Sequence, residues 1–414
     1  MYIPFAMFLV AICAVSTGAR CLFSSKCGSG WCRRLRFLVW GAGLALVLGG
    51  CASGPGPNVS RVYAPAPPVP ASSAVSAPQA VNIPAIVQSQ ARWVATDWAE
   101  LPGWQDDRLF EAWNAWIKSC EKPAAPYAAL CTQVRRLSIA TEDEQRQWLM
   151  QRFQPYRVET LQGESKGLLT AYYEPVLEAS RQPAPGFTVP VYALPAGLAP
   201  RKPWFTRQEI DTLPQAQAAL AGKAIAYFSD PIDVLMLQIQ GSGRVRMQLP
   251  DGAERVVRLA YAGSNEQPYR SVGRWLLDQG LIKDASWPGI RAWLAQNPQR
   301  QQELLWANSR VVFFKEEPLS DLDSGFGPRG AQGVALTPGR SIAVDPGSIP
   351  YGAPVWLFSE GPMQPLQRLV LAQDTGSAIT GAVRADYFVG WGAPAGALAG
   401  RLRQTLQMWI LWPK

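Results

Sequence analysis

Two aspartates near the C-terminal end of the chain lie in glycine-rich surroundings and could carry out proton chemistry. Asp374 stands in the run AQDTGSAI and Asp386 in the run RADYF. A third aspartate, Asp345, ends the strand-like run SIAV and is followed by a proline. Taken alone, each of these carboxylates is more typical of a turn or a cap than of a catalyst. If they act together, they can exchange protons with a bound substrate.

The absence of histidine restricts the chemistry further. None of the 414 residues is a histidine, which excludes a Ser-His-Asp triad, a Cys-His pair and a His-ligated zinc. General acid and base work must therefore fall to Asp, Glu, Lys, Tyr or Cys. A carboxylate is the obvious candidate for the cleavage of a glycosidic bond.

A glutamine-rich block could supply contacts to a sugar. The run DVLMLQIQGSG, residues 233–243, is predicted to be a strand that presents Gln238 and Gln240 on one face. The strand is then expected to bend through Gly241, Ser242 and Gly243. Such a bend would offer amide donors and exposed backbone to a polar ligand.

Short apolar runs separated by Gly and Pro follow residue 163 and predict a sheet framework for these blocks. The runs with strand-like alternation are GLLTAYYEPVLEASR, FTVPVYAL, AIAYFSD, DVLMLQIQGSGRVRMQL, AERVVRLAYAG, SRVVFF, SIAVDPGSIPYGAPVWLF and LQRLVLAQDTG. A helical interlude is expected at about residues 268–308. Many short strands with few long helices predict barrel-like β domains with helical additions.

Residues 92–155 instead predict two or three packed helices. The run DDRLFEAWNAWIKSC spaces its large apolar residues by three and four, which indicates one buried helix face. That face is expected to hold Leu109, Phe110, Trp113, Trp116 and Ile117. The run TEDEQRQWLMQRF begins with Thr141 as a cap and has acids in its first turn. Most of the 17 tryptophans are expected in cores.

The N-terminal region is typical of an exported lipoprotein. Basic residues 33, 34 and 36 precede an apolar stretch of about 14 residues, shorter than the roughly 20 that span a bilayer. The stretch ends in LGGC, which resembles a lipobox with Cys51 as the lipidated residue. An earlier apolar run at residues 2–15 is either a second membrane-active segment or a sign that the start codon is placed too far upstream, and we favour the second interpretation. Residues 51–91, rich in Pro, Ala and Ser, predict a semi-rigid tether.

The two remaining cysteines, Cys120 and Cys131, are expected to form a disulfide, because an exported protein reaches a compartment that permits one. The alternative is two buried free thiols. The net charge of +8 partly reflects basic residues in the first 36 positions. The sequence has no basic stripe interleaved with aromatic residues, so nothing in it favours nucleic acid as a partner.

The three runs that hold Asp345, Asp374 and Asp386, here called the C-terminal blocks, resemble the three-aspartate domain of the MltA-type membrane-bound lytic murein transglycosylases. The runs GLLTAYYEP, QIQGSG and YAGSNEQPYRSVGR resemble other characteristic segments of that family. The similarity covers about residues 150–414. It implies a double-psi β-barrel built from residues 92–172 and 318–414, a smaller β domain inserted at 173–317, and a substrate groove between them. Ala52, which follows Cys51 and is not an aspartate, resembles the pattern of lipoproteins sorted to the outer membrane, so the lipid anchor is expected there, facing the periplasm. Protein partners in cell-wall synthesis or division stay open.

Carried over by motif position, the resemblance assigns the catalytic acid to Asp386, with Asp374 as its carboxylate neighbour. The expected substrate-binding residues are Thr170, Gln240, Gly241, Ser242, Asn265, Tyr269 and Asp345. No cofactor or metal is implied.

The implied reaction cleaves the β-1,4 bond between N-acetylmuramic acid and N-acetylglucosamine in peptidoglycan without water. A single carboxyl group protonates the leaving oxygen and then takes a proton from the muramyl C6 hydroxyl, which closes a 1,6-anhydro ring. Residue content alone also allows a hydrolase that uses two aspartates. A glycan-binding lipoprotein without activity is a third interpretation, and a metal site of three aspartates is a weaker fourth.

Overall fold

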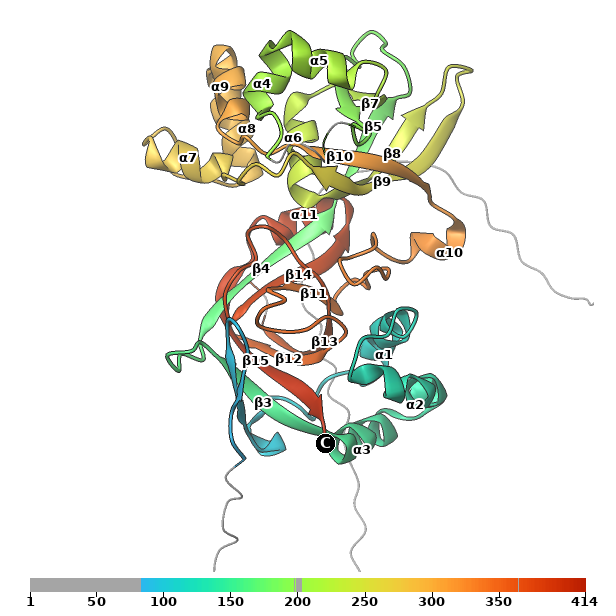
Figure 1. The fold of residues 1–414 in the computed structure, drawn as a ribbon, viewed down its shortest axis with the longest axis vertical. Helices are drawn as coiled ribbons and strands as arrows, with labels where there is room; N and C mark the ends of the chain where they lie inside the picture. Colours follow the sequence, from blue (N-terminus) through green and yellow to red (C-terminus); the bar gives the residue numbers. More distant parts are fainter. Residues whose placement is uncertain (1–82, 197, 199–202, 364) are drawn as a thin grey trace, which may run out of the picture. The chain divides into compact units, whose positions relative to one another are not determined.

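The computed structural model describes residues 83–196, 198, 203–363 and 365–414 (Figure 1). The predicted signal region, Cys51 and most of the predicted tether lie outside these residues. Within them, no helix is long and apolar enough to cross a membrane.

A sheet of nine strands forms the first β unit of the described chain. Its strands are β1 (Ile86–Val87), β2 (Arg92–Ala95), β3 (Phe153–Glu159), β4 (Gly167–Glu174), β11 (Ser341–Val344), β12 (Pro354–Ser359), β13 (Leu366–Asp374), β14 (Arg384–Trp391) and β15 (Arg403–Pro413). Six of them pair in a ring that runs β15-β12-β13-β11-β14-β4 and back to β15. Two pairs in the ring, β11–β13 and β4–β14, are parallel, and the others are antiparallel.

The long last strand closes the ring because it changes partner along its length. Residues 403–406 of β15 pair with β4, residues 407–410 pair with β12, and residues 409–413 pair with β3. Strands β3, β2 and β1 extend the sheet outward from this side. A barrel without free edges in its central ring gives neighbouring strands a fixed register, which is what a precise site requires.

The second sheet has six strands in the order β10-β9-β8-β5-β7-β6. They are β5 (Val176–Ser180), β6 (Val189–Tyr192), β7 (Ala224–Phe228), β8 (Ser242–Gln248), β9 (Glu254–Ser264) and β10 (Val312–Pro318). All six lie in sequence between β4 and β11 of the barrel. Their inward side chains, such as Val245, Met247 and Phe314, form a separate apolar core. The prediction of a mainly β fold with a barrel-like sheet and a second sheet is confirmed.

Helices pack on both sheets. Around the barrel lie α1 (Leu109–Ser119), α2 (Cys131–Arg136), α3 (Glu142–Arg152) and α11 (Gly392–Ala399), with 3-10 turns at Trp98–Glu100, Tyr127–Leu130 and Leu137–Ile139. The short helix α10 (Asp321–Ser324), which has no buried residue, lies on the segment between β10 and β11. Beside the second sheet lie α4 (Arg207–Thr212), α5 (Pro214–Leu220), α6 (Pro231–Gln240), α7 (Val272–Asp278), α8 (Trp287–Gln296) and α9 (Gln301–Trp306), with a 3-10 turn at Pro298–Arg300. The helices predicted at 92–155 and 268–308 are therefore confirmed, whereas α4 and α5 had no counterpart in the prediction.

Helix α1 packs its tryptophans against the barrel. Trp113 and Trp116 are fully buried, and their ring centroids are 5.4 Å apart. They belong to the same apolar cluster as barrel residues such as Leu369. The tryptophans of this helix thus serve the core, as expected. Phe110 was wrongly placed on the buried face, because it is 47% exposed.

The strand predicted across residues 233–241 is wrong, because this segment is helix α6. Asp230 caps the helix by accepting a hydrogen bond from the Ile232 amide, Pro231 stands at its first position, and Gly241 ends it at a φ of +79°. Positions two apart lie on different sides of a helix, so Gln238 and Gln240 do not share a face. The predicted strand begins only at Ser242, with β8.

The predicted tether is too long at its C-terminal end. Residues 86–87 already form β1, which pairs with β2. The amide of Gln90 also donates a hydrogen bond to the Gly347 carbonyl at 3.0 Å. Barrel packing therefore begins before residue 91.

Candidate active site

The two aspartates of the C-terminal blocks are brought together by the central strand β11. Ala343 of β11 pairs with Asp374 on β13 and with Asp386 on β14. On its other side, Asp386 pairs with Thr170 of β4. Four neighbouring strands of the ring thus carry the candidate site.

Asp386 is held through one of its two oxygens. The Thr170 hydroxyl donates a short hydrogen bond to Oδ1. Arg384, two residues earlier on β14, donates from Nη2 to the Thr170 oxygen at 2.8 Å, which directs the hydroxyl hydrogen toward Asp386. Within the described residues, no protein donor reaches Oδ2 of Asp386, so this oxygen is available to a ligand.

Asp374 is held through both of its oxygens. Oδ1 accepts hydrogen bonds from the backbone amides of Ala331 and Thr375, both at 2.9 Å, and Oδ2 accepts one from the Tyr172 hydroxyl at 2.9 Å. Gly330 allows the Ala331 contact, since a Cβ at this position would lie 2.4 Å from the Gln373 carbonyl oxygen. Asp374 is therefore a fixed carboxyl group rather than a mobile one.

Burial raises the pKa of both carboxyls, for a charged group loses hydration there. The pKa of Asp374 rises to about 6; burial is the main cause, the negative charge of Asp386 adds to it, and the three donors oppose it. Burial likewise raises the pKa of Asp386, against the Thr170 hydrogen bond and the charge of Arg384. Two coupled carboxyls of this kind titrate as a pair, so one proton is retained more strongly than on isolated aspartates.

Two tyrosines surround the pair. Burial raises the pKa of Tyr172 well above its ordinary value, and the charges of Asp374 and Asp386 add to the rise. Burial also raises the pKa of Tyr269, from the segment between β9 and α7, with a contribution from the charge of Asp386. Both phenols therefore stay protonated and can donate hydrogen bonds near the carboxyls.

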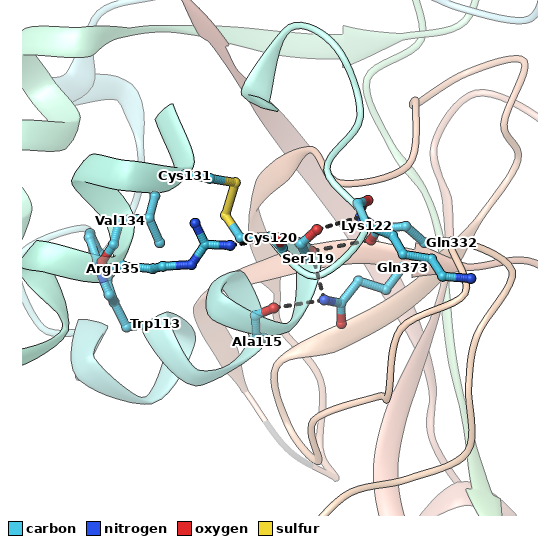
Figure 2. The surroundings of a disulfide bond; sticks show 10 residues. All are labelled: Trp113, Ala115, Ser119, Cys120, Lys122, Cys131, Val134, Arg135, Gln332 and Gln373. Atoms are coloured by element: carbon cyan, nitrogen blue, oxygen red, sulfur yellow. Dashed lines mark hydrogen bonds between the residues drawn. A yellow bond between two sulfur atoms is a disulfide. The ribbon is translucent and has the colours of Figure 1, made fainter. Parts of the chain in front are cut away.

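The end of helix α1 supports the strand that carries Asp374. Gln373, fully buried, donates from Nε2 to the Ala115 carbonyl at 2.8 Å and to the Ser119 hydroxyl at 2.7 Å. The Ser119 hydroxyl in turn donates to the side-chain oxygen of Gln332. The backbone amide of Gln332 donates to the backbone carbonyl of Gln373. Figure 2 shows these contacts gathered at the last turn of α1.

A disulfide between Cys120 and Cys131 joins this last turn of α1 to the first residue of α2 (Figure 2). The Arg135 guanidinium also donates to the Cys120 carbonyl at 2.8 Å. Cys120 directly follows Ser119, so the cross-link restrains the residue that contacts Gln373. The sequence motifs around Asp374 give no sign of this support.

A cavity of about 560 Å³ opens beside Asp374 between the barrel and the second sheet. Asp374 and Tyr172 line it from the barrel, and Gln240, Gly241 and Ser242 line it at the α6–β8 junction. Its volume is within the range of small-molecule sites. Asp386 lies two strands from Asp374, on the far side of β11, and does not line this cavity.

Three of the expected site residues have other surroundings. Asn265 is fully buried in the second unit, where its side-chain amide donates to the carbonyls of Phe205 and Ser309. Asp345 accepts from the backbone amides of Gly347 and Gly381 at 2.9 and 2.8 Å, which fixes two turns below the site. Neither lines the cavity, and neither does Tyr269, whose pKa responds to the charge of Asp386.

A buried ionic cluster joins the two sheets close to the site. Glu174, fully buried at the end of β4, accepts hydrogen bonds from Arg244 of β8 at 2.8 Å and from Arg258 of β9 at 2.6 Å. The same two arginines donate to the Phe326 carbonyl, on the segment that returns to the barrel. Both chain crossings between the sheets are thus bound by one cluster.

Some of these residues were missed in the sequence, although two carried a usable signal. Tyr172 lies two positions after Thr170, and the period of two in a strand places both on one face. Arg384 relates to Asp386 in the same way. The roles of Gln373, Glu174, Arg244 and Arg258 depend on tertiary contacts that no local pattern reveals.

Comparison with known proteins gives consistent matches over this region. The chain matches the models for the MltA specific insert domain at residues 168–315 and for the 3D domain at residues 340–412. It is 32% identical over 263 residues to a membrane-bound lytic murein transglycosylase A of Vibrio cholerae, covering 60% of this chain and 67% of that protein. The protein of the same name from Escherichia coli K12 is 33% identical over 255 residues, covering 58% of this chain and 64% of that protein.

Solved structures agree. The lytic transglycosylase LtgG of Burkholderia pseudomallei is 42% identical with a TM-score of 0.54, covering 80% of this chain and 98% of that one. MltA from Neisseria gonorrhoeae is 29% identical with a TM-score of 0.66, covering 80% of this chain and 94% of that one.

Proposed function

Because the chain belongs to the membrane-bound lytic murein transglycosylase A family and is a peptidoglycan lytic transglycosylase, we propose that Asp386 is the single acid and base of its reaction. The observation that carries this proposal is the unequal use of oxygens in the two carboxyls. Asp386 keeps Oδ2 without a protein donor, whereas both oxygens of Asp374 are occupied. A group that passes a proton to a substrate needs an oxygen that faces it.

In the first step, the Asp386 carboxyl gives its proton to the glycosidic oxygen between N-acetylmuramic acid and N-acetylglucosamine. The bond from the muramyl C1 to that oxygen breaks, and its electron pair leaves with the N-acetylglucosamine. Positive charge develops at C1 and its ring oxygen. Burial raises the pKa of Asp386, and the proposal places the proton that the coupled pair retains on Asp386 when the glycan is bound.

In the second step, the Asp386 carboxylate takes the proton of the muramyl C6 hydroxyl as that oxygen attacks C1. The new C6–O–C1 bond closes the 1,6-anhydro ring, and the enzyme regains its proton. The two steps use one carboxyl and no water. Asp374, fixed on the other side of β11, supplies negative charge beside the developing positive charge.

The polar residues around the cavity support binding of the glycan. Gln240, Gly241 and Ser242 line it, and Thr170 orients Asp386. Tyr269 is suited to donate a hydrogen bond near the scissile bond. For Asn265 and Asp345, their contacts support the shape of the loops around the site in place of direct substrate contact.

The chain's place in the cell envelope is proposed from its sequence and its relatives. The two curated relatives are named as membrane-bound. Lipidation of Cys51 would anchor this chain to the outer membrane on its periplasmic face, with residues after it as a tether. The proposed domain division, 92–172 with 318–414 around an insert at 173–317, is supported by the membership of most strands in the two sheets, although β1 lies before residue 92 and β4 extends to Glu174.

Digestion of purified sacculi followed by mass spectrometry tests the reaction. We expect muropeptides with 1,6-anhydro ends, which are lighter by one water than the reducing ends that a two-aspartate hydrolase releases. Reducing ends as the main product would contradict the single-carboxyl mechanism. The Asp386→Asn variant should release neither product while it still binds sacculi, which separates an enzyme from a glycan-binding protein.

A further inference from the structure

The cavity beside Asp374 contains positive charge that the proposed mechanism does not use. Lys122 and Arg329 line it from the barrel side, and Arg310 and Lys315 line it from the second sheet. Lys315 is neutralised by Glu317, which also lines the cavity, at 2.8 Å. Lys122, Arg310 and Arg329, here called the three cavity cations, are joined to no acid by an ion pair within the described residues.

Two of these cations converge from segments that are about 200 residues apart in sequence. A Cβ built on Gly333 would lie 2.9 Å from the Lys122 Nζ, and the Arg329 guanidinium donates to the Gly333 carbonyl at 3.3 Å. Both cations therefore meet the same residue. Lys122 is held at this point because Gln332 donates to its carbonyl at 3.1 Å (Figure 2).

The two cations do not act as partners of the catalytic carboxyls. Within the described residues, Asp374 accepts hydrogen bonds from the Ala331 and Thr375 amides and the Tyr172 hydroxyl, and it forms no ion pair with a cation. Like charges gathered without an acid repel each other, a cost that a bound anion removes. An anion that enters this cavity would lie beside the reacting glycan.

We propose that Lys122, Arg310 and Arg329 form a subsite for carboxylates attached to the glycan strand. This inference rests on the proposed function, since the substrate must be murein. The sugar rings of murein are neutral. Its carboxylates belong either to the peptide stems or, where a stem has been removed, to the lactyl group of muramic acid. Arginine and lysine both bind carboxylates by charge-assisted hydrogen bonds.

The subsite gives the enzyme a means to prefer carboxylate-bearing strands over neutral oligosaccharides. The cations lie on both sides of the cavity, on the barrel and on the second sheet, so a bound strand would meet positive charge from both. Because these side chains are at least partly exposed to solvent, their attraction should weaken as salt concentration rises. Neutral sugar contacts, in contrast, should depend little on salt.

Binding measurements on the full chain in the Asp386→Asn background test this without relying on catalysis. Three soluble ligands distinguish the sources of charge: a muramyl tetrasaccharide with peptide stems, the same tetrasaccharide after amidase treatment, and neutral chitohexaose. The test variant is Lys122→Gln with Arg310→Gln and Arg329→Gln. The matched control removes three exposed cations elsewhere, by Arg255→Gln, Lys283→Gln and Arg401→Gln.

We expect calorimetry to show the test variant binding the stem-bearing ligand about tenfold more weakly, with unchanged binding of chitohexaose. A loss confined to the stem-bearing ligand identifies the peptide as the source, and a loss for both muramyl ligands identifies the lactyl carboxylate as well. Unchanged binding of both muramyl ligands, or an equal loss for chitohexaose, overturns the proposal.

Two further measurements keep this test independent. Retained chitohexaose binding shows that the triple variant is folded, and the single Arg329→Gln variant repeats the comparison if it is not. Anhydro products from the wild-type enzyme on sacculi are measured separately. Failure of the subsite therefore leaves the proposed reaction intact, and failure of the reaction appears in the products alone.

Discussion

Asp374 and Asp386 lie on opposite sides of one strand and are in register with the same residue of it, Ala343. Their backbones are therefore about 10 Å apart, two strand spacings. The Tyr172 hydroxyl donates a hydrogen bond to Asp374, and the charges of both aspartates raise the pKa of its phenol. This arrangement gives two identical side chains different surroundings, which is how proteins assign different roles to paired carboxyls.

Replacement of the proposed acid should remove most of the activity. We expect Asp386→Asn to lower kcat by about 10²–10⁴-fold with little change in the affinity for glycan, because an amide cannot pass a proton in either step. Release of anhydro-muropeptides from sacculi measures the rate. Asp278→Asn, which changes an exposed carboxylate on α7, is the matched control and should keep full activity.

The pH profile of the two aspartate variants distinguishes their roles. Asp374→Asn should cost about 10²-fold in kcat and should abolish the acid limb of kcat/KM, because the charge that develops on Asp374 as pH rises is lost. It should keep the alkaline limb, which reports deprotonation of Asp386. If Asp374→Asn removes the alkaline limb and Asp386→Asn keeps it, the two roles are reversed.

Tyr172→Phe should move the acid limb toward higher pH. The Tyr172 hydroxyl donates to Asp374 and favours its charged form, so its loss raises the pKa of Asp374 above its present value of about 6. Asp374 then becomes charged only at higher pH, and the rise in kcat/KM shifts with it. Tyr173→Phe is a close control, since that hydroxyl contacts the Met236 sulfur instead. An unshifted limb in Tyr172→Phe would show that Asp374 does not set it.

Loss of the disulfide should affect both stability and rate. The loop it closes has a sequence separation of 11, so Cys120→Ala with Cys131→Ala should reduce the free energy of unfolding by about 3 kcal/mol. Kcat should also fall, since Ser119 next to Cys120 supports Gln373 and through it Asp374. Urea unfolding and initial rates measure the two effects. Reductant should reproduce both in the wild type and add nothing in the double variant. A lower free energy of unfolding without any change in kcat would show that the end of α1 does not position the site.

Glu174→Gln should destabilise the protein strongly. It leaves Arg244 and Arg258 buried with an uncompensated charge, which typically costs about 3–5 kcal/mol. Glu178→Gln on β5 breaks an exposed pair with Arg246 at 3.4 Å and should cost about 0–1 kcal/mol. Denaturant midpoints of the two variants provide the comparison. Similar values for both would mean that water reaches the Glu174 cluster.

The sequence predicted those elements whose signal is local. Thr141 and Glu144 form the capping box that begins α3, and the spacing of Trp113 and Trp116 predicts α1. Helix α6 was misread because VLMLQIQ alternates like a strand while also fitting a helix. The signals that favour the helix were Asp230 as its cap, Pro231 at its first position and Gly241 directly after it.

Contacts between distant segments could not be predicted from local patterns. Asp386 pairs with Thr170 across 216 residues, and their hydrogen bond exists only because β14 and β4 are parallel neighbours in the ring. The motif resemblance identified the aspartates as site residues but did not reveal this strand pairing. The partners of Glu174 on β8 and β9 are set in the same way by packing.

The cluster at Glu174 has a consequence for how such a chain could have been assembled. The Arg258 guanidinium spans from the Glu174 carboxylate, at 2.6 Å, to the Phe326 carbonyl, at 2.8 Å. The end of the outgoing strand β4 and the segment that returns to the barrel are therefore only one side chain apart at this point. A linker of a few residues could replace the whole second sheet and leave a continuous barrel. The second sheet is thus an insertion whose two ends meet at one place on the barrel. Its sequence can diverge without disturbing the register of the strands that carry the aspartates.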